Sequence, residues 1–177
     1  MEVIEVHSLT ARNTHIRPCS EGRMFLKGRT VFEAMADLDC HEWLFWYIAA
    51  NSVVQGKGEL AVLFACECAW LCAPNDPVID RVSLCMQRGE QYHQVLERQE
   101  KDGFFSHLLT YGGNQYLVIK WLIRMAHSLS NDPNDFAETD YQTCFTHMSN
   151  HFGYALDCYG LSIAETKQMA LEFFRVK

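Results

Sequence analysis

The sequence lacks basic runs and long apolar runs, and each absence argues against a class of function: nucleic-acid binding for the first and membrane insertion for the second. Its 15 Lys and Arg residues are outnumbered by 22 Asp and Glu residues, which gives a formal net charge of −7. A duplex-binding surface needs clustered positive charge to release counterions, so direct nucleic-acid binding is not expected. No stretch of about 20 uninterrupted apolar residues occurs, so no membrane span is expected. The opening residues, MEVIEVHSLTAR, are not expected to form a signal peptide because they contain two glutamates and no long apolar segment.

Sequence motifs of common enzyme classes are also missing. The chain contains no G-x-x-x-x-G-K, G-x-G-x-x-G, G-x-S-x-G or H-E-x-x-H pattern. Cys40 and His41 are adjacent, but neighbouring residues on a helix diverge by about 100°. His41 is therefore poorly placed to activate Cys40 as a nucleophile. These absences favour a non-enzymatic protein without excluding an enzyme.

Cysteine, in contrast, is abundant, with eight residues in the chain. Most of them lie inside apolar runs such as 64–72, where a free thiol behaves as a small hydrophobic group. Apolar residues make up 49% of the sequence, which is enough for a hydrophobic core without disulfide bridges. We therefore expect reduced, mostly buried thiols and a cytoplasmic location.

Apolar periodicity and helix-capping patterns predict an all-α fold. The predicted helices cover residues 31–38, 40–52, 59–73, 78–101, 104–110, 115–129, 136–157 and a last segment that follows Ser162. Capping boxes are predicted at Thr30–Glu33, Asp39–Glu42 and Ser162–Glu165. Asp76 is a predicted N-cap with Pro77 at the first helical position.

The first 28 residues lack this periodicity and are expected to form an irregular arm or one short strand. No linker rich in Ser, Gly or Pro divides the rest of the chain. The sequence thus predicts one compact domain of seven or eight helices over residues 29–177, preceded by an arm over residues 1–28.

The best candidate metal site is formed by Cys144, His147 and His151. Spacings of three and four residues place these side chains on one face of a helix. A thiolate and two imidazoles are three of the four ligands that a tetrahedral zinc ion needs, and Asp140 or His127 is a candidate for the fourth. The alternative is that both histidines lie at the edge of the core and that Cys144 only packs.

Aromatic residues suggest a second kind of site, in the predicted helix 40–52. Trp43, Trp46 and Tyr47 are close enough together to cover more than one face of that helix. An exposed aromatic patch would suit a protein interface, where Trp and Tyr supply much of the binding energy. The alternative is that neighbouring helices cover these rings completely.

The order of several short motifs resembles a known group of proteins. The motifs are Cys19-Ser-Glu21, Phe25-Leu-Lys-Gly28, Phe32-Glu-Ala34, Trp43-Leu-Phe-Trp46 and Phe64-Ala-Cys66-Glu-Cys-Ala69. Together they are similar to a loose group of small all-α proteins found in bacteriophage genomes and near bacterial toxin–immunity loci. The resemblance covers about residues 19–92 and is specific at Trp43–Trp46 and its spacing to Cys66. It implies a helical protein that binds another protein, and it brings no catalytic residues.

The sequence therefore predicts a non-enzymatic protein-binding module, of the kind that inhibits or adapts a host or toxin protein. The negative net charge would speed its encounter with a basic partner. Self-association through the tryptophan-rich face, giving a homodimer, is compatible with this prediction. The alternative function is a zinc-binding protein or hydrolase that uses Cys144, His147 and His151, and only that alternative requires a cofactor.

Overall fold

Seven helices and no strand occur in the part of the chain that the computed structural model describes, residues 24–25, 28–89, 112–129 and 138–176. In chain order they are α3 (Val31–Asp37), α4 (His41–Val54), α5 (Gly58–Cys72), α6 (Pro77–Arg88), α9 (Gly113–Leu129), α10 (Glu138–Tyr159) and α11 (Ile163–Val176). The all-α prediction is confirmed. The predicted helix 104–110 and nearly all of the predicted arm lie outside the described residues.

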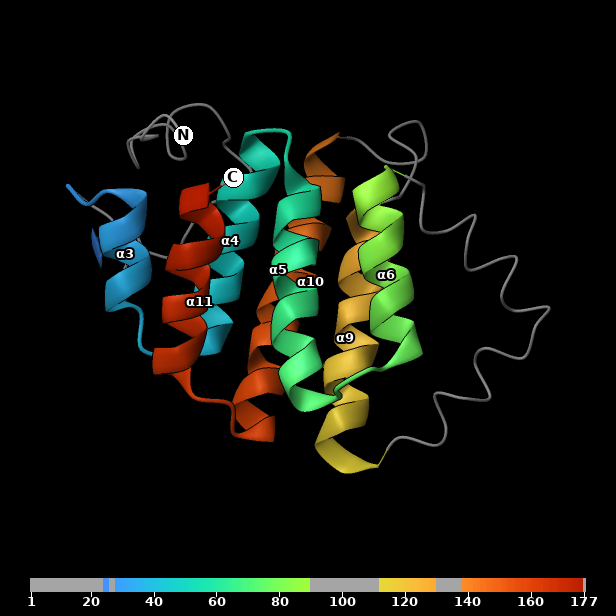
Figure 1. Ribbon diagram of the computed structural model, residues 1–177. Coiled ribbons are helices and arrows are strands. Elements are labelled where there is room, and N and C mark those ends of the chain that lie inside the picture. Colours follow the sequence, from blue (N-terminus) through green and yellow to red (C-terminus); the bar gives the residue numbers. More distant parts are fainter. Residues whose placement is uncertain (1–23, 26–27, 90–111, 130–137, 177) are drawn as a thin grey trace.

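The helices pack in two layers (Figure 1). One layer consists of α4, α10 and α9, and α10 lies between the other two and has the most extensive contacts with both. In the second layer α5 packs against α4 and α9, α6 packs against α5 and α9, and α11 contacts α5 and α3. None of the helices in the described ranges is long and apolar enough to cross a membrane.

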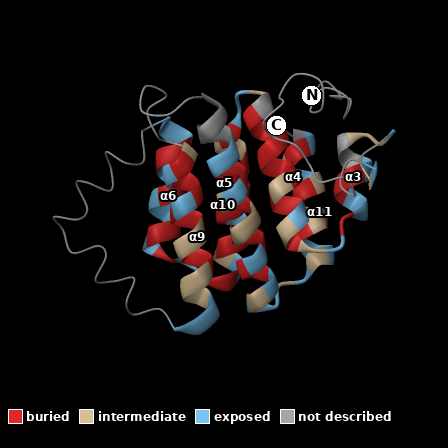
Figure 2. Ribbon diagram, turned by 180° about the vertical axis from the view of Figure 1, so that it is seen from behind, coloured by how far each residue is buried: buried red, intermediate tan, exposed pale blue. Residues whose placement is uncertain are grey.

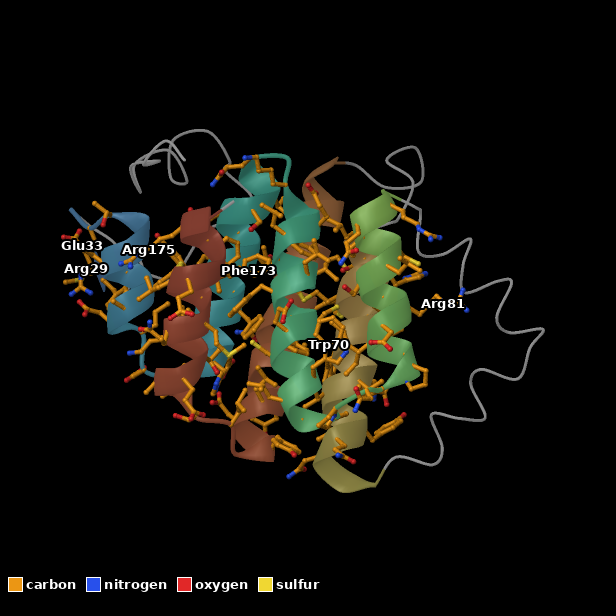
Figure 3. The ribbon with its side chains drawn as sticks, viewed as in Figure 1. Arg29, Glu33, Trp70, Arg81, Phe173 and Arg175 are labelled. Atoms are coloured by element: carbon orange, nitrogen blue, oxygen red, sulfur yellow. The ribbon has the colours of Figure 1, made fainter. Side chains whose placement is uncertain are left out.

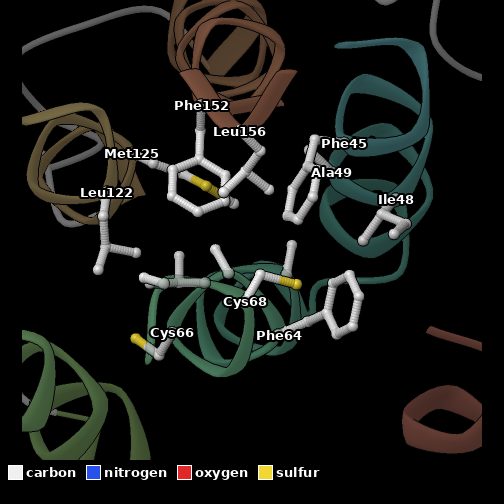
Figure 4. Close-up of a cluster of buried hydrophobic side chains, with 14 of the residues drawn as sticks. Phe45, Ile48, Ala49, Phe64, Cys66, Cys68, Leu122, Met125, Phe152 and Leu156 are labelled. Carbon is white, nitrogen blue, oxygen red and sulfur yellow. The ribbon is translucent and has the colours of Figure 1, made fainter. Parts of the chain in front are cut away.

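Aromatic rings fill the space between the two layers (Figure 4). Phe45 of α4 stacks on Phe64 of α5 at a centroid distance of 5.4 Å and meets the edge of Phe152 of α10 at 4.9 Å. All three side chains are fully buried. Offset and edge-on ring pairs of this kind stabilise beyond their area burial by about 1 kcal/mol each. Buried residues occur on all seven helices, so the core is continuous (Figure 2).

Three of the predicted helix starts have the expected side-chain cap, and at one of them Ser162 Oγ accepts from the N–H group of Glu165 at 3.4 Å. Thr30 and Glu33 form a complete capping box, in which each side chain bonds the other residue's backbone N–H (Glu33 is labelled in Figure 3). These bonds lower the pKa of Glu33 because they stabilise the carboxylate. Asp76 Oδ1 accepts from the N–H groups of Val78 and Ile79, at 2.8 and 3.4 Å.

The prediction that Asp39 caps α4 is wrong. The N-cap is Cys40, and no side-chain capping bond is present there. The N–H group of His41 instead reaches Asp157 Oδ1 on α10, at 3.4 Å. A residue distant in sequence therefore takes the role that the local pattern assigned to Asp39.

The predicted helix 78–101 is too long, since α6 ends at Arg88. Gly89 has a left-handed conformation with φ of 64°, and its N–H group bonds the carbonyl groups of Cys85 and Met86. A left-handed residue at this position is a common way for a helix to stop, and glycine adopts it without strain. Residues 90–101, the rest of this predicted helix, lie outside the described part.

All seven cysteines that the structure describes are free thiols, and Cys19 lies outside the described residues. Four are buried, as expected: Cys66, Cys68, Cys72 and Cys85. Burial raises the pKa of Cys66 and of Cys68, and it raises the pKa of Cys72 to about 11. These thiols therefore stay protonated at neutral pH and act as small apolar side chains.

Candidate functional site

The outward face of α10 carries a strip of polar and aromatic side chains. Its members recur at spacings of three and four residues and therefore lie on one side of the helix: Cys144, His147, His151, Tyr154 and Cys158. Tyr154 is the most exposed aromatic side chain among the described residues, at 53%. A hydrogen bond with Cys158 raises the pKa of Tyr154.

The two histidines of this strip are in direct contact. The Nε2 atoms of His147 and His151 are 3.1 Å apart, and the two rings meet edge to face with their centroids 4.4 Å apart. His147 is exposed, whereas His151 is half-buried. Burial and the neighbouring His147 lower the pKa of His151, which favours its neutral form at pH 7.

Helix α9 adds an aromatic ring and two cations to this face. The indole of Trp121 is nearly parallel to the His151 ring, at a centroid distance of 4.5 Å. Lys120 Nζ and Arg124 Cζ each lie 5.5 Å from the centre of the Trp121 ring. Cation–π attraction at this distance helps to fix the indole, by about 0.5–1 kcal/mol per contact at an exposed site.

Helix α4 borders the strip on its other side. Glu42 acts electrostatically on both His151 and Tyr154, and its carbonyl oxygen accepts a hydrogen bond from the side chain of Asn150. Trp46 is one turn from Glu42 on the same face of α4. The ring of Trp46 meets Trp43 edge to face, at a centroid distance of 6.4 Å.

The three predicted interface residues thus lie in different environments. Trp43 is 37% exposed and Trp46 is half-buried, so both are accessible. Tyr47 is 1% exposed and belongs to the core. Its hydroxyl has no hydrogen-bond partner among the described residues, and burial raises its pKa to about 12. We use the name aromatic surface for the following residues: Trp43, Trp46, Trp121, His147, His151 and Tyr154.

The predicted metal ligands are only partly brought together. The Nε2 atoms of His147 and His151 lie close together. Within the described ranges, however, no group of three or more His, Cys, Asp or Glu side chains is arranged to hold a metal. Cys144 is exposed one turn before His147. His127 is on the exposed side of α9, and the side chain of Asp140 lies outside the described set.

A buried network that the sequence did not reveal holds α4, α10 and α11 together. His41 is fully buried, and its Nδ1 atom is 2.5 Å from Asp157 Oδ1 of α10. Its Nε2 atom is 2.8 Å from the hydroxyl oxygen of Thr166 on α11. Thr166 is also fully buried, and its hydroxyl lies within hydrogen-bond distance of the Ser162 carbonyl oxygen.

The order carboxylate, imidazole, hydroxyl in this network is that of a hydrolase triad. In a hydrolase, however, the hydroxyl must reach a substrate, whereas here both His41 and Thr166 have no exposed surface. The network is therefore suited to fix the positions of three helices and not to attack a substrate.

Gly153 allows α10 to approach α4 closely beside the aromatic surface. A Cβ atom at this position would lie 2.3 Å from the carbonyl oxygen of His41 and 2.7 Å from the Cα atom of Glu42. The two backbones are therefore in contact, which holds Glu42 next to the outward strip of α10.

Comparisons with known proteins leave the resemblance seen in the sequence without further support. Parts of its residue range, 19–23, 26–27 and 90–92, also lie outside the described chain. No protein-family model, no curated protein and no solved structure matches the chain.

Proposed function

We propose that this chain is a non-enzymatic helical module that binds a protein partner through the aromatic surface. Two groups of accessible rings carry the proposal: Trp43 with Trp46 on α4, and Trp121 with the two histidines of α10. Glu42 of α4 acts electrostatically on His151 and so links the two groups. Trp and Tyr are the side chains that most often dominate the energy of protein interfaces, because they bury a large apolar area and still offer a polar atom.

The rings are already held in place before a partner binds. Trp121 is stacked on His151 and lies close to two cations, and Trp46 packs edge to face with Trp43. A side chain that is fixed in the free protein loses little conformational entropy on binding. The aromatic surface is therefore suited to binding without rearrangement.

Charge argues for the kind of partner. The chain has a net charge of −7, which would attract a basic protein and raise the association rate at low salt. Lys120 and Arg124 lie close to Trp121 and Glu42 acts on His151, so charges of both signs can set the orientation of the partner. A role as inhibitor or adaptor, and self-association into a homodimer, stay predictions.

The alternative function, a zinc protein or hydrolase, keeps support for two of its three predicted ligands. The geometry brings His147 and His151 together and does not add the thiol of Cys144. A hydrolase built on all three residues therefore stays a prediction.

The proposed function is tested by affinity purification from a lysate of the source organism, with quantitative mass spectrometry. The bait proteins are the wild type, Trp43→Ser, Tyr154→Ser and a control, Leu71→Ser. Leu71 is a matched control because it is 48% exposed but lies on α5, in the other layer. We expect one enriched protein with the wild type and the control, and at least tenfold less of it with the other two variants.

Two results would contradict the proposal. One is loss of the captured protein with Leu71→Ser but not with Trp43→Ser or Tyr154→Ser, which would place the interface on α5. The other is capture that does not differ between any of the four baits, since binding would then not involve the aromatic surface. Circular dichroism of each variant shows whether its helices are intact.

A further inference from the structure

The histidine pair on α10 belongs to the aromatic surface, but its geometry also suits a second function that is independent of protein binding. We propose that His147 and His151 form a two-ligand site for a divalent transition-metal ion of the nickel, copper and zinc group. The two residues lie one turn apart on the outward face of the helix, and their Nε2 atoms are 3.1 Å apart. Both nitrogens therefore approach a common point from the same element.

The separation of the two nitrogens suits the coordination of one such ion by both. An imidazole nitrogen binds zinc at about 2.0–2.1 Å. Two nitrogens 3.1 Å apart at that distance subtend an angle of about 98° at the metal. This value lies between the right angle of square-planar or octahedral ions and the tetrahedral angle, so the separation of the nitrogens suits either geometry.

The chemistry of the donors selects the class of ion. Imidazole suits nickel, copper and zinc, whereas magnesium and calcium prefer oxygen ligands. Two protein ligands leave the remaining coordination positions to water, which His147 allows because it is exposed. The site consists of the two imidazoles alone, because Cys144 forms no group of three with them in the part of the chain described.

The surroundings of the pair both help and limit binding. Glu42 places a negative charge near His151, which favours a bound cation. Lys120 and Arg124 lie close to Trp121, against which His151 is stacked, and their positive charges oppose it. The two rings also contact one another directly without metal, so the helix presents them together at little further cost in entropy.

The test uses the full chain without an affinity tag, under reducing conditions, with Ni²⁺ as the only added metal. Isothermal titration calorimetry measures stoichiometry and affinity, and tryptophan fluorescence measures proximity to Trp121, whose ring centre is 4.5 Å from that of His151. We expect one Ni²⁺ per chain and quenching of fluorescence. His147→Ala and His151→Ala should each weaken binding at least tenfold, and Trp121→Phe should reduce the quenching while leaving the calorimetric binding.

Matched controls separate this site from other donors. His127→Ala removes an exposed histidine on α9, and Cys144→Ala removes the thiol one turn away, and neither should change the Ni²⁺ affinity. Because His147 is exposed, His147→Ala is expected to fold normally, and circular dichroism checks this. Absence of binding at millimolar Ni²⁺, unchanged binding by His147→Ala, or loss of binding in Cys144→Ala would each overturn the two-histidine assignment.

Discussion

At the scale of single residues, His41 is a fully buried polar side chain whose hydrogen-bond partners are distant in sequence. Both of its ring nitrogens and its backbone N–H group are hydrogen-bonded to side chains of other helices. Removing one partner of a fully buried polar group leaves the other unsatisfied, which costs about 1–3 kcal/mol. Substitution of one member of this network should therefore lower the free energy of unfolding.

We predict that Asp157→Ala lowers the free energy of unfolding by about 2 kcal/mol, because it leaves the buried Nδ1 of His41 without its partner. Asp37→Ala is the matched control. It removes the same group from an exposed ion pair with Arg29, in which the Asp37 side chain is 60% exposed, and it should cost less than about 1 kcal/mol. Urea denaturation at pH 7 measures both, and equal losses would show that the network adds no stability.

Single residues were predictable where their partners are local. The pairing of His147 with His151 follows from a spacing of four residues on one helix. The partners of His41, in contrast, are 116 and 125 residues away, and no local pattern indicates them. Tyr47 was also predicted as an interface residue together with Trp43 and Trp46, but it is buried. On a helix that is apolar nearly all round, periodicity does not show which of its sides is covered by neighbouring helices.

At the scale of helices, the contact between α4 and α10 depends on Gly153. The atoms that a Cβ would meet are all backbone atoms of α4, at 2.3, 2.5 and 2.7 Å. Backbone atoms of a packed helix cannot rotate away as a side chain can. The two helices would have to move apart, which would disturb the buried network and the position of Glu42.

We therefore predict that Gly153→Ala lowers the free energy of unfolding by about 3 kcal/mol, although alanine is the better helix former. Gly58→Ala is the control, since its Cβ would meet the flexible end of the Leu129 side chain at a similarly short distance. We expect that variant to lose about 1 kcal/mol or less. Thermal unfolding followed by circular dichroism compares the two, and a small effect at Gly153 would contradict the close helix contact.

The helices themselves were predictable from the sequence, but two of their ends were not. The caps at Thr30 and Asp76 are formed by neighbouring residues and were found correctly. Instead of a local cap from Asp39, the N–H group of His41 donates a tertiary hydrogen bond to Asp157. At Gly89 a single left-handed residue interrupted an amphipathic pattern that continues on both sides of it. The apolar periodicity of a sequence shows which side chains would share a face of a helix. It does not show where a single residue with a left-handed backbone ends that helix.

At the scale of the whole molecule, the core contains ionisable groups that are stable only when neutral. Burial raises the pKa of Cys72 from 9.0 to about 11 and that of Tyr47 from 10.0 to about 12, and it raises the pKa of Cys66 and Cys68 as well. In the unfolded chain these groups lose their protons at lower pH than in the folded protein. The folded state is therefore favoured at neutral pH, and this advantage is lost as the pH rises.

We predict that the melting temperature falls steadily between pH 9 and pH 11 in the presence of a reducing agent. Cys72→Ala should make this fall shallower, because it removes one group that titrates in that window. Leu71→Ala changes an exposed neighbouring side chain without removing an ionisable group, so it should leave the slope unchanged. Differential scanning calorimetry at half-unit pH steps measures the three slopes, and identical slopes for the wild type and Cys72→Ala would contradict the prediction.

The place of α10 between α4 and α9 also determines when the molecule can acquire its structure. Hydrogen bonds between α4 and α10 join residues 108 and 116 positions apart, so the first layer cannot close until α10 has been synthesised. Contacts between distant parts of a chain form slowly, and the apolar faces that await them are prone to aggregate. A nascent chain that has emerged only as far as α9 thus has the properties of a chaperone client, and the emergence of α10, not synthesis of the early helices, determines when this layer can close.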